Sequence, residues 1–251
     1  MYLKILSKSI LGTRDEQQDA YYANSSDGRT FAVVCDGMGG SLGGAAASST
    51  AVTKIRELVS SKKPDETYPM FFIRVIDILD EEIVMLQKQK NTKGAGTTIV
   101  AVIIENKELH WLSVGDSRLY IIRQNEIAKV TRDHNYALSL EHFYNDEHNS
   151  SVILKEEQRK DALISFIGIG GVKIFDVNNT AFSLIDNDII LLTTDGLTNL
   201  VNDDEIYQIL INENINSSFE KLFELAESRA NGVQDNTTCV LIKVINTNNL
   251  I

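Results

Sequence analysis

The sequence predicts a layered α+β domain, in which short antiparallel strands are framed by a few long amphipathic helices. Three observations favour this class. Short runs rich in β-branched residues recur along the chain, brief polar gaps separate some of these runs, and longer stretches carry apolar residues at helical spacing. Because brief polar gaps are typical of hairpin turns, the strands beside them are expected to be antiparallel.

The expected strands are apolar runs enriched in Val, Ile and Leu. In chain order they lie at 31–34, 97–104, 109–114, 119–122, 189–192 and 237–244. The polar gaps at 105–107 and 123–126 are expected to be hairpin turns.

Three helices are expected to frame these strands. The first, at 45–59, is rich in Ala and Ser. The second is predicted by one apolar stripe at helical spacing, made of Phe72, Val75, Ile76, Leu79, Ile83 and Leu86. The third has a stripe of Phe219, Leu222, Phe223 and Ala226, and is expected to end near Asn231 and Gly232.

The region from 133 to 171 fits neither pattern. It is polar, has no clear period, and carries His134, His142 and His148, whose irregular spacing does not suit a metal site. Long irregular segments inside a compact domain often lie over functional sites. We expect an excursion with a short helix that lies over the sheets.

Length and charge limit the function further. The chain has 251 residues, 43% of them hydrophobic, and no linker-like stretch divides it. A single domain over 1–251 is therefore expected. The 24 basic and 35 acidic residues give a net charge of −11. This balance argues against duplex DNA and anionic membranes as main partners, because both require a basic surface.

Cys35 and Cys239 are the only cysteines, and both lie in apolar runs where buried strand residues are expected. Two cysteines make neither a disulfide scaffold nor a zinc site. No apolar run approaches the length of about 20 residues that a bilayer span requires. Residues 1–10 lack the apolar core of a signal peptide. A cytoplasmic location is expected.

Four aspartates stand where an expected strand ends or begins: Asp36, Asp116, Asp195 and Asp235. For any one of them, turn chemistry is the simpler explanation. Four such positions together favour a different explanation, a shared cation site. If these strand ends meet at one edge, several carboxylates come together, and they repel one another unless a hard cation neutralises them. Oxygen ligands without a set of His and Cys favour Mg²⁺ or Mn²⁺.

Glycines surround the first of these aspartates, at 37, 39, 40, 43 and 44. A dinucleotide-binding fingerprint fails here, because Leu42 stands where its third glycine belongs. The sequence also lacks the Gly-Lys-Ser/Thr signature of a nucleotide-binding loop. The glycines instead predict a loop whose main chain can approach a metal closely.

Together these motifs resemble those of the type 2C, metal-dependent protein phosphatases, in particular the bacterial members. Six motifs occur in the family's order over essentially the whole chain, at 14–19, 36–40, 96–98, 115–118, 195–197 and 235–238. The resemblance implies a central β-sandwich of two antiparallel sheets with helices on both outer faces, in four α-β-β-α layers. It also implies one phosphatase catalytic domain, with a flap at about 133–171.

The resemblance assigns a role to each motif residue. Asp36 would bridge two metal ions, and the main-chain carbonyl of Gly37 would bind one of them. Asp195 and Asp235 would complete the shell of the other ion, and Asp19 would hold metal-bound water. Arg14 would bind the substrate phosphate, and Asn236 would orient a nearby water. Asp116, together with Asp195, would form a third, weaker metal site.

The implied activity is hydrolysis of phosphoserine and phosphothreonine in proteins, by a water that two Mn²⁺ or Mg²⁺ ions activate. The implied partners are phosphoprotein substrates, namely a bacterial Ser/Thr kinase and its targets, and the protein would act as an antagonist of that kinase. It is expected to be a monomer. Three residues depart from the family pattern. Gln17 stands where many members have Asn. Met38 replaces a histidine of animal members, as is usual in bacteria, and Asn199 replaces an often acidic residue, which weakens the third metal site.

Within the enzyme class, a phosphatase for a single phosphoserine regulator is an alternative to one for many kinase substrates. Two functions from other classes also remain open. A non-catalytic relative that binds phosphoproteins would be expected to have lost a metal aspartate, whereas Asp19, Asp36, Asp195 and Asp235 are all present. A divalent-cation-binding module without turnover would have no use for the guanidinium of Arg14 beside its metals.

Overall fold

The structure is a computed structural model that describes residues 2–140, 161–212 and 214–245. Its strands are β1 (Tyr2–Ile10), β2 (Asp19–Ser26), β3 (Arg29–Met38), β4 (Gly96–Thr97), β5 (Ile99–Glu105), β6 (Glu108–Val114), β7 (Arg118–Arg123), β8 (Glu126–Lys129), β9 (Asp176–Val177), β10 (Phe182–Ser183), β11 (Ile189–Thr193) and β12 (Thr237–Ile245). Its helices are α1 (Ser41–Ser60), α2 (Tyr68–Lys90), α3 (Tyr136–Leu140), α5 (Asp195–Thr198), α6 (Asp203–Leu210) and α7 (Ile215–Arg229).

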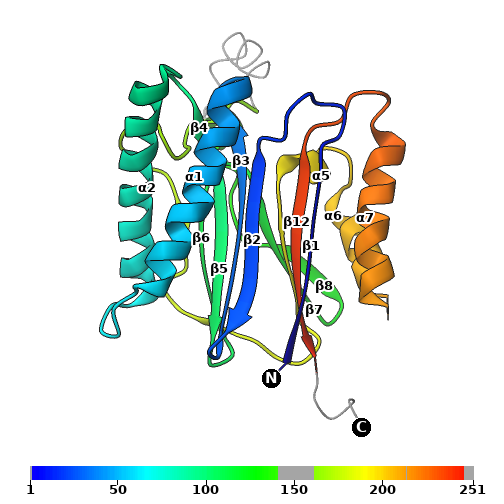
Figure 1. The fold of residues 1–251 in the computed structure, drawn as a ribbon. Helices are drawn as coiled ribbons and strands as arrows, with labels where there is room; N and C mark the ends of the chain where they lie inside the picture. Colours follow the sequence, from blue (N-terminus) through cyan, green and yellow to red (C-terminus); the bar gives the residue numbers. More distant parts are fainter. Residues whose placement is uncertain (1, 141–160, 213, 246–251) are drawn as a thin grey trace, which may run out of the picture.

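The described strands form two antiparallel sheets that pack face to face in the centre of the molecule (Figure 1). One sheet has the order β1-β12-β11-β7-β8, and the other has the order β10-β6-β5-β3-β2, with β4 paired to β3 and β9 to β6. Helices α1 and α2 cover the outer face of the second sheet, and α6 and α7 cover the outer face of the first (Figure 1). The predicted four-layer sandwich is therefore confirmed.

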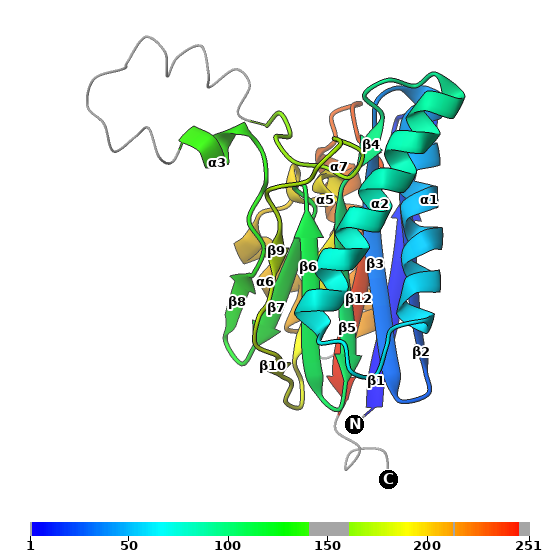
Figure 2. The ribbon, with the colours of Figure 1, turned by 90° about the vertical axis from the view of Figure 1, so that its left-hand side faces the viewer.

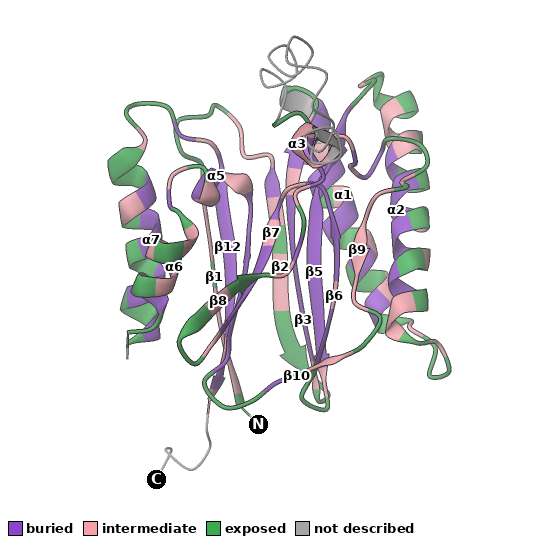
Figure 3. Cartoon of the chain, turned by 180° about the vertical axis from the view of Figure 1, so that it is seen from behind, coloured by how far each residue is buried: buried purple, intermediate pink, exposed green. Residues whose placement is uncertain are grey.

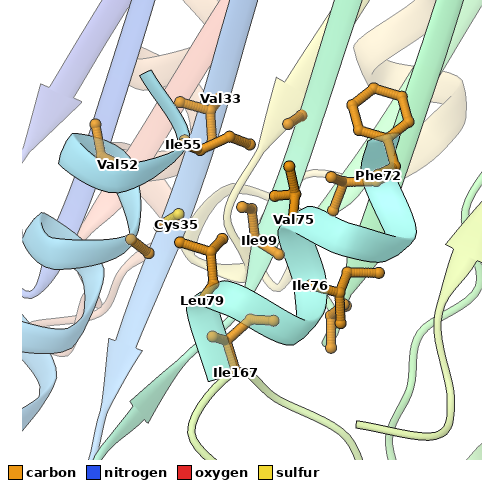
Figure 4. Packing of buried hydrophobic residues seen from close by; sticks show 14 of the residues in the cluster. Val33, Cys35, Val52, Ile55, Phe72, Val75, Ile76, Leu79, Ile99 and Ile167 are labelled. Atoms are coloured by element: carbon orange, nitrogen blue, oxygen red, sulfur yellow. The ribbon is translucent and has the colours of Figure 1, made fainter. Parts of the chain in front are cut away.

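Apolar side chains fill the spaces between the layers, and the two-residue period of a strand decides which space each one enters. Val34 of β3 packs between the sheets, in a cluster that includes Ile190 and Val240 from the opposite sheet. Its neighbours Val33 and Cys35 point the other way, into the cluster beneath α1 and α2 (Figure 4). Strands buried on both faces explain why the sequence shows continuous apolar runs there.

Helices α1 and α2 lie side by side over β3 and β6 (Figure 2). The inward faces of α2 and α7 are buried and their outer faces are exposed (Figure 3). Helix α2 starts after Thr67, whose hydroxyl accepts a hydrogen bond from Met70 N, and ends at Asn91 in the left-handed conformation, at φ 53°. No helix within the described ranges is both long and apolar enough to cross a membrane.

All expected strands and the three expected helices are present, and both cysteines are buried. One boundary was wrong, because the run 97–104 is divided at Thr98 into β4 and β5. There the backbone turns to the tip of β3: Thr98 N donates to Asp36 O at 2.8 Å. Strands β1 and β2 were not predicted. Strand β2 has no β-branched residue that would have indicated it.

The predicted excursion at 133–171 is described at 133–140 and 161–171, and its middle lies outside the described residues. The expected short helix is α3. The two described stems pair with each other, since Asn135 and Leu163 form an antiparallel bridge.

Candidate active site

The predicted aspartates gather at one end of the sandwich, because the strands beside them begin or end there. Asp36 lies near the end of β3, and the antiparallel register places Asp19, the first residue of β2, directly opposite it. Asp195 begins α5 immediately after β11, and Asp235 lies just before β12, which pairs with β11. Asp116 follows the end of β6.

Burial and mutual repulsion raise the pKa values of these carboxyl groups. Burial raises the pKa of Asp19 to about 7, and the carboxylates of Asp195 and Asp235 add to the effect. Burial raises the pKa of Asp36 well above its ordinary range, with Asp19 and Asp195 as further causes. The pKa of Asp195 is also raised, first by burial and further by Asp235. The carboxylates therefore act on one another as a single cluster.

Asp116 belongs to the same cluster. Burial raises its pKa to about 7, Asp195 and Asp133 add to the rise, and Arg118 opposes it. The guanidinium of Arg118 is itself held by both oxygens of Asp133, at 3.0 and 2.8 Å. This cation beside the predicted third-metal residues was not singled out in the sequence, although it closes the motif at 115–118.

The main chain around Asp36 is fixed by the motif at 96–98. Thr97 Oγ1 and Thr98 N both donate to Asp36 O at 2.8 Å. Asp36 N in turn donates to Thr98 Oγ1 at 2.9 Å. These three hydrogen bonds explain why two threonines stand at this position, and they hold the start of the glycine-rich loop.

Gly37 lies where backbone segments approach too closely for a side chain. A Cβ atom added there would lie 2.2 Å from Gly44 O and 2.6 Å from Gln18 O. A Cβ on Gly44 would lie 2.7 Å from the Gly37 carbonyl oxygen that is predicted to bind a metal. The two glycines thus leave room for that carbonyl.

Arg14 and Asp235 come from loops at the two ends of the described chain, and they form an ion pair. Arg14 Nη2 donates to Asp235 Oδ2 at 2.6 Å, and the arginine side chain is 58% exposed. The predicted phosphate-binding group therefore lies beside a predicted metal ligand, with much of its surface free for a substrate.

Asn236 holds the Arg14 loop in place. Its Nδ2 donates to Leu11 O at 2.8 Å and to Glu16 O at 3.1 Å, and its Oδ1 accepts from Gln18 N at 2.8 Å. Both N–H groups are used by the protein, so only the second lone pair of Oδ1 is left for the water that it is predicted to orient. Besides its predicted role toward a water, Asn236 thus also holds the loop that carries Arg14.

Several carboxylate oxygens fit a cation. Asp19 Oδ1 and Asp195 Oδ1 are buried without a hydrogen-bond partner, and such oxygens are costly unless a positive group satisfies them. Other oxygens are held by protein donors: Asp19 Oδ2 accepts from Thr194 Oγ1 at 3.0 Å, and Asp195 Oδ2 accepts from Asn199 Nδ2 at 3.1 Å.

The carboxylates do not form a ready-made cage. Within the described ranges, no three His, Cys, Asp or Glu side chains are arranged around a point where they could hold an ion. An oxygen-only donor set suits Mg²⁺ or Mn²⁺, and binding would require these side chains to turn toward the ion.

His134 was predicted to have no part in a metal set, and its contacts agree with a supporting role. It is fully buried. Its Nδ1 accepts from Gly115 N at 3.1 Å, and its backbone N donates to Gly115 O at 2.9 Å. Its Nε2 lies 3.4 Å from Asp176 Oδ2. His134 thus holds Gly115, the residue before Asp116, through both of its main-chain polar groups. His142 and His148 lie outside the described residues.

Comparison with known proteins agrees with this geometry. A model of the family described as protein phosphatase 2C matches residues 8–241 of the chain. The chain belongs to the protein phosphatase 2C family. The serine/threonine phosphatase stp of Listeria monocytogenes is 29% identical over 227 residues, which cover 87% of this chain and 86% of that protein.

Solved structures of phosphatases share the fold. The serine/threonine phosphatase of S. agalactiae has a TM-score of 0.82 and 27% identity, and the match covers 97% of this chain and 100% of that one. The catalytic domain of the serine/threonine protein phosphatase PstP, solved with two manganese ions, has a TM-score of 0.77 over 97% of this chain and 99% of its own. Its identity is 24%, so this likeness shows the fold alone. The predicted family and enzyme class, a protein serine/threonine phosphatase, are confirmed.

Proposed function

We propose that this phosphatase hydrolyses phosphoserine and phosphothreonine in proteins at the carboxylate end of the sandwich, with two Mn²⁺ or Mg²⁺ ions. The observation that carries the proposal is the cluster of buried carboxylates with raised pKa values, two of which have unpartnered oxygens. The two manganese ions of PstP support the same cofactor class.

Asp36, the Gly37 carbonyl, Asp195 and Asp235 would hold the two ions, and Asp19 would support them. When bound, the ions would activate a water and neutralise charge on the phosphoryl oxygens. The residues of the chain supply orientation. Arg14 lies beside Asp235 with its guanidinium largely exposed, so its planar set of donors can bind two oxygens of an incoming phosphate.

The finer predictions belong to the same proposal. A third, weaker ion would use Asp116 with Asp195. The substrates would be targets of a Ser/Thr kinase, neither nucleic acid nor membrane would be a partner, and residues 1–251 would act as one monomeric cytoplasmic domain. The net charge of −11 supports the absence of nucleic acid.

The test is hydrolysis of p-nitrophenyl phosphate and of a phosphothreonine peptide, with Mn²⁺ and with excess chelator. We expect turnover of both substrates with Mn²⁺ and none with chelator. A suitable control is Asp15→Asn, because Asp15 is an exposed neighbour of Arg14 outside the carboxylate cluster. Peptide binding without turnover, in a folded protein with Mn²⁺, would overturn the proposal in favour of a non-catalytic phosphoprotein-binding module.

A further inference from the structure

A buried carboxylate on α2 binds a glycine-rich loop far from it in sequence. Asp80 is buried among the apolar residues of the helix. Its Oδ1 accepts from Gly168 N at 2.7 Å and from Gly170 N at 3.2 Å, and its Oδ2 accepts from Gly171 N at 2.5 Å. One carboxylate therefore satisfies three main-chain donors of a single loop.

The glycines make this arrangement possible. Gly168, Gly170 and Gly171 all have positive φ, at 104°, 85° and 113°, and such a backbone turns successive N–H groups toward one point. Concave sets of N–H groups of this kind usually bind anions. Here the anion is a side chain of the protein itself.

Gln87 fastens the same loop from two helical turns further along α2. Its Nε2 donates to Gly168 O and to Ala95 O, both at 2.6 Å. Asp80 and Gln87 lie on the helix face that also carries Ile83, and a Cβ on Gly168 would lie 2.6 Å from Ile83 Cγ2. Helix α2 thus holds the loop with both an acceptor and a donor.

A short series of main-chain contacts joins this loop to the active site. Ile167, next to Gly168, forms a bridge with Thr97 of β4, with N···O distances of 2.9 and 3.0 Å. Thr97 pairs with Gly37 on its other side, and its hydroxyl donates to Asp36 O. Strand β4 has only two residues, so its position depends on the neighbours on its two sides.

We propose that Asp80 and Gln87 are positioning residues for cation binding, because they fix the 167–171 loop that holds β4 against Gly37. The inference rests on the proposed function, in which the Gly37 carbonyl binds a metal. It deepens that function by extending the metal site to a buried carboxylate that touches neither metal ligand nor substrate.

The test measures Mn²⁺ affinity by calorimetry, at a temperature where circular dichroism shows every variant folded. Asp80→Ala removes all three acceptor contacts, and we expect it to weaken Mn²⁺ binding about fivefold. This is less than the roughly 10- to 100-fold loss typical for residues that hydrogen-bond directly to a metal-ligating group. The Mn²⁺ concentration for half-maximal hydrolysis of p-nitrophenyl phosphate should rise in parallel. The rate at saturating Mn²⁺ should stay within about twofold, because no group that contacts substrate is lost.

Asp80→Asn provides a rescue. Its amide oxygen can keep the two contacts of Oδ1, so Mn²⁺ affinity should return to within about twofold of the wild type. Gln87→Leu tests the second contact independently, and we expect it to weaken binding in the same direction. The matched controls are Asp77→Ala and Gln89→Leu, since both residues are exposed on the same helix, and neither should change the affinity.

A double-mutant cycle separates positioning from general loss of stability. Thr97→Val removes the hydroxyl contact with Asp36 O, which is the last step of the series. If Asp80 acts through β4, the combined variant should weaken Mn²⁺ binding by less than the product of the single effects.

Unchanged affinity in Asp80→Ala and Gln87→Leu, or fully multiplicative effects with Thr97→Val, would overturn this inference while the wild type still binds Mn²⁺ and turns over. If the wild type itself neither binds Mn²⁺ nor hydrolyses the substrates, the proposed function fails together with the inference.

Discussion

The strands of the sandwich carry charged residues at both ends, but these residues have different partners at the active-site end and at the end away from it, called the far end. At the far end, Arg29 pairs with Glu105 across β3 and β5, and Arg123 binds both oxygens of Asp188. Asp36, Asp116 and Asp195 lie at the active-site end of these strands or of their neighbours. The charged groups that act on them are mostly other aspartates, not cations.

The pKa values show the consequence. At the far end, hydrogen bonds from Tyr68 and Arg29 lower the pKa of Glu105 despite its partial burial. At the active-site end, burial and repulsion raise the pKa values of Asp19 and Asp116 to about 7. At the far end the carboxylates are paired with cations, whereas those at the active-site end repel one another, and the proposed metal ions would relieve this repulsion. The comparison separates carboxylates that stabilise the fold from those whose burial and mutual repulsion lower its stability.

The largest expected effect comes from Asp36→Asn. Because Asp36 is the predicted bridging ligand, we expect hydrolysis of the phosphothreonine peptide with Mn²⁺ to fall roughly 1,000-fold. In chelator, the variant should unfold no more easily than the wild type, since it removes a repelling charge. Peptide kinetics and chemical denaturation check both expectations, and substantial residual turnover would show that the metal assignment is wrong.

The same change at the far end, Asp188→Asn, should have the opposite profile. It leaves the guanidinium of Arg123 without its carboxylate, and we expect a loss of about 3 kcal/mol in the free energy of unfolding. The rate of the folded enzyme should be nearly unchanged. Urea denaturation and peptide kinetics measure the two quantities. A variant that keeps its stability but loses activity would remove the distinction between the two ends.

The dependence of stability on pH should also reveal the repulsion at the active-site end. Asp19 and Asp116 have pKa values of about 7 in the folded chain, against an ordinary value of 3.8. Between these values the folded protein holds protons that the unfolded chain has released, so stability in chelator should fall as pH rises from about 4 to about 7. Glu105, with its lowered pKa, acts below this range.

Thermal unfolding at several pH values, with chelator and with Mn²⁺, measures this dependence. Mn²⁺ should restore stability above pH 7, because it replaces the protons. A chelator-treated protein whose stability rises steadily across the same range would contradict the raised pKa values.

The smallest expected effect is that of Asp116→Asn. Asp116 lies at the margin of the cluster with Arg118 nearby, and Asn199 stands where a further acid would strengthen a third site. We expect less than about a tenfold loss in rate at saturating Mn²⁺, together with a shift in the Mn²⁺ concentration required. Titration of activity with Mn²⁺ distinguishes this outcome from the outright loss that Asp36→Asn should cause.

The sequence predicted the carboxylate end well, because strand ends followed by Asp-Gly are local signals. It predicted the four layers only through the resemblance, since which sheet faces which depends on contacts between distant residues. Strand β2 lacked β-branched residues, and the apolar residues of β1, interrupted by lysines and serines, were not recognised as a strand. Yet β2 sets the register that places Asp19 opposite Asp36.

Two residues show what sequence reasoning overlooks. Asp80 interrupts the apolar stripe of α2, and an acid on the buried face of a helix is a signal that a partner exists. The partner, 168–171, could not be named because it lies about 90 residues away. Asn236 is predicted by resemblance to orient a water, and the fold adds that its contacts hold the loop of Arg14. Motif residues can be located from sequence, but their hydrogen-bond partners require the fold.

The position of β12 has a consequence for biosynthesis. This strand follows every other described strand in the chain, yet it lies at an interior position of its sheet, between β1 and β11. It also follows directly on Asp235 and Asn236, which anchor Arg14 and its loop. On the ribosome, a nascent chain that ends before β12 therefore lacks an interior strand of the sheet, and with it the framework that positions Asp235 and Asn236 against Arg14 and its loop. The proposed catalytic site can therefore assemble only after synthesis has passed β12.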